Sequence, residues 1–159
     1  MIAAAATTTT PVHYRKPGWF TRNVLNRAVA RLTRMGVSVW GSRVLEVPGR
    51  SSGAPRQVPV NLLTFADRQY LVSARGDGQW VRNVRANDGR LDLLLGRRRT
   101  PWLATEVADA DKVDVLRAYL KRWKAEVGVF FDGVDASSSD EAILAIASKH
   151  PVFSLDDAR

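Results

Sequence analysis

The chain of 159 residues contains no cysteine and two histidines, His13 and His150. The lack of cysteine excludes disulfides, thiolate zinc sites, iron–sulfur clusters and a cysteine nucleophile. Two histidines so far apart in the sequence do not make a histidine-rich metal site, so we expect no metal. No apolar run reaches the roughly 18 residues that a membrane-spanning helix needs, and we expect a cytoplasmic protein.

Composition and length predict one globular domain behind a tail. Hydrophobic residues make up 45% of the chain and charged residues 25%, which is ordinary for a globular protein. About 150 residues is a typical domain length. Residues 1–17 are low in complexity and rich in Ala and Thr, with two prolines at their end, so we interpret them as a disordered tail. Residues 18–159 are then a single domain.

Positive charge is concentrated in the first part of the chain. The net charge is +8, and residues 1–99 hold 17 Lys and Arg against 5 Asp and Glu. Residues 100–159 hold 7 against 11. This asymmetry predicts an anionic partner for the first part. Charge alone does not choose among nucleic acid, an anionic membrane surface and a phosphorylated small molecule.

Residues 19–35 have apolar side chains at helical spacing, with asparagines and arginines on the other face. We expect this amphipathic helix to pack on the core of the domain. The alternative is a peripheral contact with an anionic membrane, which would make the protein membrane-associated.

Period-two alternation and turn residues predict about six strands in the remaining chain. The strands are expected at residues 43–47, 56–65, 69–73, 90–95, 100–107 and 151–155. Helices are expected at residues 80–86, from residue 109 or 111 to about 127, and near 139–148. Asp109 or Asp111 is expected to cap the second helix, and Ser138 the third. Because strand follows strand, the sheet should be mostly antiparallel and close into a small barrel, an α+β fold.

Two glycine-rich segments are candidate binding loops. Residues 49–56 combine two glycines, two serines and the arginines Arg50 and Arg56, which suit a phosphate or carboxylate. Residues 73–80 end a strand and begin a short helix, with Arg75 before it and Trp80 and Asn83 on it. The alternative for each segment is a plain solvated loop, with Trp80 in the core.

Two further clusters have simpler interpretations. The run of arginines at residues 97–99 is expected to be solvated, and no nucleic-acid-binding motif accompanies it, so we expect no nucleic acid. Phe130, Phe131 and Phe153 belong to the core or line an apolar pocket. His150 is expected to face solvent before the last strand.

Three motifs in order carry a resemblance to a known family. V-P-G-R-S-S-G-A-P-R-Q-V-P-V at residues 47–60 resembles the G-R-x-S-G-x-x-R-x-x-P-L stretch of the deazaflavin-dependent nitroreductase family of split β-barrel oxidoreductases. L-V-S-A-R-G at residues 71–76 and W-V-R-N-V-R-A-N at residues 80–87 are similar to its next two motifs. A closing H-P-V-F strand completes the resemblance.

The resemblance implies a split β-barrel that binds coenzyme F420, whose phosphate and oligoglutamate groups suit a basic surface. It implies a reductase that transfers a hydride from reduced F420 to a quinone, an enone or other activated alkene, or a nitro compound. The implied cofactor-binding residues are Arg50, Ser51, Ser52, Arg56, Val58, Pro59, Val60, Ala74, Arg75, Gly76, Trp80 and Asn83. The expected pocket for a hydrophobic substrate consists of Phe20, Phe130, Phe131 and Phe153.

One departure bears on catalysis. Some members of the family place tyrosines near the substrate, where this chain has Phe130 and Phe131. Phenylalanine cannot donate a proton, so the proton would come from solvent, from the cofactor or from another side chain, of which His150 is the nearest candidate by type. The sequence identifies no catalytic residue. The alternatives are a carrier that binds F420 without turnover and a split-barrel protein that binds FMN. We expect a monomer or a homodimer.

Overall fold

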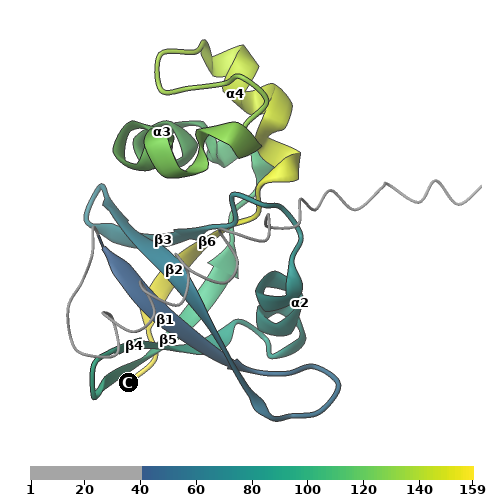
Figure 1. Ribbon diagram of the computed structural model, residues 1–159, viewed down its shortest axis with the longest axis vertical. Helices are drawn as coiled ribbons and strands as arrows, with labels where there is room; N and C mark the ends of the chain where they lie inside the picture. The colour runs from purple at the N-terminus through teal and green to yellow at the C-terminus, as the bar shows by residue number, and fades with distance from the viewer. Residues whose placement is uncertain (1–40) are drawn as a thin grey trace, which may run out of the picture.

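The computed structural model describes residues 41–159. Six strands form a closed barrel in the order β1-β2-β3-β6-β5-β4, and every neighbouring pair is antiparallel (Figure 1). This confirms the predicted α+β class and the six antiparallel strands. The predicted tail, the helix predicted at residues 19–35 and Phe20 lie outside the described residues, so the division into residues 1–17 and 18–159 stays a prediction.

Each strand overlaps its predicted segment. The strands are β1 (Ser42–Pro48), β2 (Pro55–Phe65), β3 (Arg68–Val72), β4 (Arg90–Leu95), β5 (Arg98–Glu106) and β6 (Val152–Asp157). The long strand β2 pairs with β1 up to Asn61 and with β3 from Leu62 onward, which lets one strand join two sides of the barrel. Ala66 and Asp67, both with positive φ, form the two-residue turn between β2 and β3.

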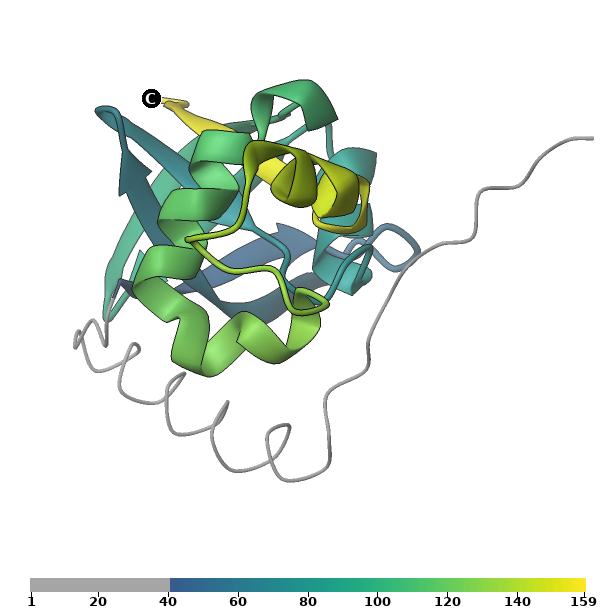
Figure 2. The ribbon, with the colours of Figure 1, turned by 90° about the horizontal axis from the view of Figure 1, so that it is seen from above.

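Three helices of residues 41–159 accompany the barrel. They are α2 (Gln79–Ala86), α3 (Val113–Val127) and α4 (Asp140–Ile146), with 3₁₀ turns η2 (Asp109–Asp111), η3 (Gly128–Phe130) and η4 (Ala147–Lys149). Helix α2 lies beside the barrel, whereas α3 and α4 lie together across its β3 and β6 side (Figures 1 and 2).

The predicted caps of the last two helices were wrong. Asp109 and Asp111 form a separate 3₁₀ turn, so Lys112 precedes α3 and makes no side-chain cap. Helix α4 is capped by Ser139, whose Oγ accepts a hydrogen bond from the backbone N–H of Ala142 at 3.2 Å. The Ser138 Oγ instead accepts from the N–H of Asp135 at 2.9 Å, which closes the preceding turn.

Two hydrophobic clusters hold the fold together. One fills the barrel with inward-facing strand residues such as Leu45, Leu91 and Leu93, and helix α2 adds Val81 and Val84. The second joins α3 and α4 to the outer face of the barrel. It consists of Leu63, Val72, Val115, Leu116, Tyr119, Leu120, Trp123, Val127, Phe131, Ile143, Ile146, Ala147 and Val152. Helix α3 is therefore fixed on the barrel by burial along its apolar face.

The expectation that His150 faces solvent was wrong. His150 is fully buried, and its ring stacks on Phe131 with 4.0 Å between ring centroids and 16° between planes. The residue follows the 3₁₀ turn η4, and the chain must turn inward there to place Val152 in the core. His150 does not line the cavity described next.

Candidate functional site

A cavity of about 760 Å³ lies between the β1–β2 hairpin, the start of α2 and helix α3. This volume is in the range of small-molecule and cofactor sites. Eleven of the twelve residues expected to bind the cofactor line it: Arg50, Ser51, Ser52, Arg56, Val58, Pro59, Val60, Ala74, Arg75, Trp80 and Asn83. The structure thus brings together the two loops that the sequence singled out.

The β1–β2 hairpin supplies the basic end of the cavity. Its turn is closed by two backbone hydrogen bonds, from Gly49 N–H to the Ala54 carbonyl at 2.8 Å and from Gly53 N–H to the Gly49 carbonyl at 2.7 Å. A Cβ on Gly49 would lie 3.3 Å from Nε of Arg56. The absence of a side chain at Gly49 therefore leaves room for Arg56 to pass close to the turn.

The hairpin is tied to helix α2 through Arg50. The Arg50 guanidinium donates to Oε1 of Gln79 at 2.7 Å and to Oδ1 of Asn83 at 3.0 Å. The backbone N–H of Arg50 donates to the same Asn83 oxygen at 3.2 Å. Asn83 is 5% exposed, so the two bonds to Asn83 are partly buried, whereas the bond to Gln79 is exposed. Arg50 is thereby held at the mouth with its positive charge near the space between hairpin and helix.

The loop after β3 is held in a tight turn. The Ser73 hydroxyl donates to the Gly76 carbonyl at 2.6 Å, and the Gly76 N–H donates to the Ser73 carbonyl at 3.2 Å. Gly76 has φ +90°, a left-handed conformation that favours glycine. Gly76 does not line the cavity, in contrast to the other expected cofactor residues. Its carbonyl instead fixes the turn that presents Ala74 and Arg75.

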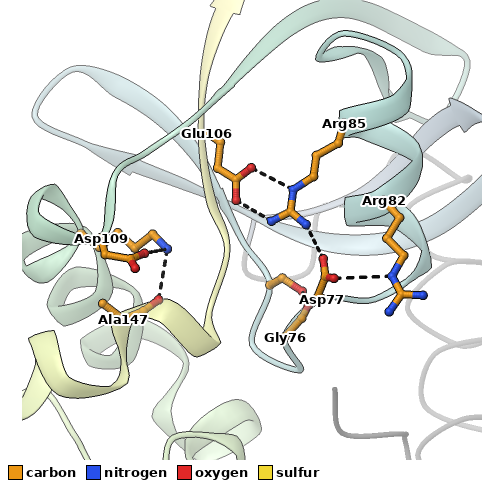
Figure 3. A network of polar contacts seen from close by, with 9 residues as sticks. Gly76, Asp77, Arg82, Arg85, Glu106, Asp109 and Ala147 are labelled. Carbon is orange, nitrogen blue, oxygen red and sulfur yellow. Dashed lines mark hydrogen bonds and ion pairs between the residues drawn. The ribbon is translucent and has the colours of Figure 1, made fainter. Parts of the chain in front are cut away.

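An ion-pair network anchors this loop to α2 and β5 (Figure 3). The Asp77 carboxylate pairs with Arg82 at 3.5 Å and with Arg85 at 2.5 Å. Arg85 also donates to both oxygens of Glu106, at 2.9 and 2.6 Å. The hydrogen bond to Glu106 is the main reason that the pKa of Arg85 lies above its ordinary value. The network lies on the outer side of α2 and supports the cavity without lining it.

The end of the cavity near α3 is aromatic and apolar. The Arg75 guanidinium lies over the Phe130 ring, 4.9 Å from its centroid. Val72 and Val127 line the wall beside this pair, and Glu126 brings one carboxylate to the edge. The cavity therefore has a basic end at the hairpin and a largely apolar end at the helix.

Tyr119 is a lining residue that the sequence analysis did not single out. Its side chain is hydrogen-bonded to Asn61 of β2, which also lines the cavity. Tyr119 is 3% exposed, and burial raises the pKa of its phenol well above the ordinary value. The phenol is therefore neutral at physiological pH. Its position three residues after Leu116 and four before Trp123, on the apolar face of α3, is the only signal that could have indicated it.

The four phenylalanines expected in the substrate pocket have different positions. Phe130 lines the cavity. Phe131 is 0% exposed and belongs to the core beneath α3, where it packs against His150 and Tyr119. Phe153 is 2% exposed inside the barrel and contacts Trp80, with 5.7 Å between ring centroids. Phe131 and Phe153 therefore do not line the cavity, because each is buried in one of the two hydrophobic clusters. Phe20 lies outside the described residues.

The arginine run at residues 97–99 does not belong to this cavity. Arg99 pairs with Glu46 and Asp92, each at 2.6 Å, on the exposed face of the barrel. Within residues 41–159, no helix is long and apolar enough to cross a membrane.

Comparison with solved structures shows the same fold at low sequence identity. An F420-H2 dependent reductase, FDR-A, is 19% identical with a TM-score of 0.50, over 73% of this chain and 94% of that chain. A conserved hypothetical protein from Mycobacterium tuberculosis is 14% identical with a TM-score of 0.51, over 96% and 87%. A structure described as a domain-swapped dimer is 19% identical with a TM-score of 0.51, over 86% and 97%. No curated protein matches the chain.

A family model identifies the sequence more directly. The model described as F420H(2)-dependent quinone reductase matches residues 13–136, which include both loops of the cavity and all of α3. The predicted resemblance to deazaflavin-dependent reductases and the split-barrel fold are confirmed. Because the match covers far more than half of the sequence, the chain belongs to the F420H(2)-dependent quinone reductase family.

Proposed function

We propose that this chain binds coenzyme F420 in the cavity and, with the cofactor reduced, transfers a hydride to a hydrophobic acceptor, a quinone in the first place. The observation that carries the proposal is the gathering of Arg50, Arg56 and Arg75 around one cavity of about 760 Å³. Membership of the F420H(2)-dependent quinone reductase family supports the same cofactor.

The residues present fit the cofactor. Arginine forks bind phosphate and carboxylate oxygens, so Arg50 and Arg56 would hold the anionic arm, with hydroxyl donors from Ser51 and Ser52 beside them. The apolar stretch of β2 at residues 58–60 would support the ring system. F420 supplies the hydride when it is bound and reduced, and the protein contributes binding, orientation and electrostatics.

The acceptor would occupy the apolar end of the cavity, where Phe130, Val127 and Val72 offer a surface for a flat hydrophobic molecule. Tyr119 provides a neutral hydrogen-bond donor there. Asn61, the hydrogen-bond partner of Tyr119, would donate its amide N–H to the phenolic oxygen, so that the Tyr119 proton would point toward an acceptor oxygen. An enone or nitro compound presents similar oxygens, but a reduced quinone can also take its proton from water.

The experiment is to follow reduced F420 by absorbance or fluorescence with menadione as the acceptor. We expect tight binding and oxidation of the cofactor faster than in buffer. Tight binding without oxidation of F420 by any quinone or enone would favour the carrier alternative. Preferential binding of FMN over F420 in a competition titration would favour the FMN alternative.

Three predictions about the protein outside this site remain. Sedimentation with anionic vesicles at low and high salt tests the peripheral membrane contact. Analytical ultracentrifugation distinguishes a monomer from a homodimer. Fractionation of cells that express the protein tests the expected location.

A further inference from the structure

The three arginines that line the cavity come from two places in the fold. Arg50 and Arg56 belong to the β1–β2 hairpin, and the Arg50 guanidinium donates to Asn83 of α2 at 3.0 Å. Arg75 belongs to the loop after β3, and its guanidinium lies over the ring of Phe130, which follows α3. Because α2 and α3 lie on different sides of the barrel (Figure 1), Arg50 and Arg75 border the cavity from different sides. Arg75 is therefore separate from the basic end of the cavity.

Both the backbone and the side chain hold Arg75 in place. The Ser73 hydroxyl donates to the Gly76 carbonyl at 2.6 Å, which closes the turn around Arg75. The guanidinium lies 4.9 Å from the centroid of the Phe130 ring, within the range of a cation–π contact. Arg75 is half-buried, so salt screens its charge less than it would on an open surface. The loop thus presents a fixed positive charge at the apolar end of the cavity.

The charge of Arg75 acts on Tyr119. Burial is the main reason that the pKa of the Tyr119 phenol is high; the charge of Glu126 raises that pKa further, whereas the charge of Arg75 lowers it. Arg75 therefore favours negative charge where the Tyr119 hydroxyl lies. Glu126 is the one acidic residue among the described residues that line the cavity, and it is exposed at the edge, where water screens its charge.

A quinone that receives a hydride becomes an anion before it becomes a quinol. The hydride brings two electrons and one hydrogen, so the product is a hydroquinone monoanion, and the hydride donor is oxidised by the same two electrons. One further proton, from the Tyr119 hydroxyl or from water, completes the quinol, and Tyr119 regains its proton from solvent. A fixed cation beside the acceptor oxygen lowers the barrier, because negative charge grows on that oxygen during the transfer.

We propose that Arg75 is a catalytic residue that, together with the Tyr119 hydroxyl, stabilises the negative charge on the acceptor oxygen. Arg50 and Arg56 then hold the anionic arm of F420, and Arg75 contributes little to holding it. This differs from the family resemblance, which implied a cofactor-binding role for Arg75. The inference rests on the proposed function and narrows its substrate class to acceptors whose oxygen takes up the charge, such as quinones and enones.

The first measurement is the steady-state rate with reduced F420 and menadione. Arg75→Met should lower kcat/KM for menadione by about 10- to 100-fold, since a charge next to the developing oxyanion is lost. The dissociation constant of F420 should change by less than about threefold. Arg75→Lys should recover part of the rate, because it keeps the charge. Arg68→Met is the matched control, since Arg68 is exposed, pairs with Asp156 and does not line the cavity.

The second measurement is binding without turnover. Lawsone, a hydroxynaphthoquinone that is ionised at neutral pH, shares the two rings of menadione and resembles the hydroquinone monoanion. Both compounds are titrated into protein loaded with oxidised F420, which cannot donate a hydride. The wild type should bind lawsone at least about fivefold more tightly than menadione, and Arg75→Met should lose this preference. Arg68→Met should keep it.

Circular dichroism checks the fold of each variant, and Arg75→Gln replaces Arg75→Met if that variant is unfolded. Wild-type kcat/KM in the folded variant would overturn the inference, as would an unchanged preference for lawsone. A salt-sensitive loss of F420 affinity as large as that of Arg56→Ala would place Arg75 on the anionic arm and also overturn it. A wild-type protein that neither binds nor oxidises F420 would overturn the proposed function as well, whereas normal oxidation that does not depend on Arg75 would overturn this inference alone.

Discussion

Arg50 donates two hydrogen bonds to a single oxygen of Asn83, one from its backbone N–H at 3.2 Å and one from its guanidinium at 3.0 Å. The two residues are 33 positions apart in the chain. Asn83 lies on α2, whereas Arg50 lies in the β1–β2 hairpin, so this one side chain fixes the distance between the two walls of the cavity's basic end. The position of Arg50 toward an anionic ligand therefore depends on Asn83.

Asn83→Ala should reduce both stability and F420 affinity. The substitution removes the acceptor of two hydrogen bonds at a site that is 5% exposed, so we expect a loss of about 1–2 kcal/mol in the free energy of unfolding. The freed hairpin should also weaken F420 binding several-fold. Urea unfolding and a fluorescence titration measure the two effects. Asn87→Ala, at the far end of the helix and outside the cavity, should leave the F420 affinity unchanged.

Arg56→Ala should weaken F420 binding by about 10- to 100-fold, since a charge-assisted hydrogen bond is worth roughly 1.5–3 kcal/mol. The loss should shrink as salt rises, because screening weakens the interaction in the wild type. Fluorescence titrations at two salt concentrations measure it. Arg68→Ala is the control, since Arg68 is exposed, pairs with Asp156 and does not line the cavity. Equal F420 affinity in Arg56→Ala and the wild type would argue against this role of Arg56.

Tyr119→Phe should lower kcat/KM for menadione by about 5- to 100-fold while leaving the dissociation constant of F420 nearly unchanged. The variant removes one hydroxyl from the apolar end of the cavity and keeps the ring that packs against Trp123 and Phe131. Tyr70→Phe, at a half-buried position outside the cavity, should retain wild-type turnover. A Tyr119→Phe variant with full activity would show that the acceptor does not use this hydroxyl.

The same tyrosine predicts how stability responds to alkaline pH. Burial raises the pKa of Tyr119 in the folded protein above its ordinary value of 10.0. Above that pH, the unfolded chain loses the phenolic proton while the folded protein keeps it, so unfolding becomes more favourable as pH rises. We expect the free energy of unfolding to fall above about pH 10, and to fall less steeply in Tyr119→Phe. Identical slopes from urea unfolding at pH 9 to 11 would contradict this explanation.

Gly89→Ala should destabilise the barrel by about 2–4 kcal/mol. Gly89 has φ +80°, and a Cβ at this position would lie 2.1 Å from the carbonyl oxygen of Ala104 on β5. The neighbouring strand must move because backbone cannot rotate away as a side chain can. Thermal unfolding measures the loss, and Gly133→Ala serves as a control with similar φ (+81°) and open space around the Cβ. Equal effects of the two variants would assign the cost to φ alone.

Local pattern predicted most of the fold and the loops of the candidate site. Strand β4 (Arg90–Leu95) and helix α3 follow from alternation and helical spacing, which depend only on neighbouring residues. Residues 49–56 and 73–83 were recognisable because a tight turn needs glycine and an anion needs donors, and both requirements are met within a few residues. The caps of α3 and α4 were predicted less well, since several adjacent polar side chains could have served.

The sequence by itself determined the strand and helix segments, the basic hairpin and the family resemblance, because each is encoded in residues close together in the chain. The tertiary structure alone decided which side chains meet across the barrel. Helical spacing shows that Tyr119 lies on the buried face of α3, but only the packing of α3 on β2 places it beside Asn61. Likewise, Phe131 and His150 are buried because α3 and α4 pack against the barrel, which brings together residues that no local pattern relates.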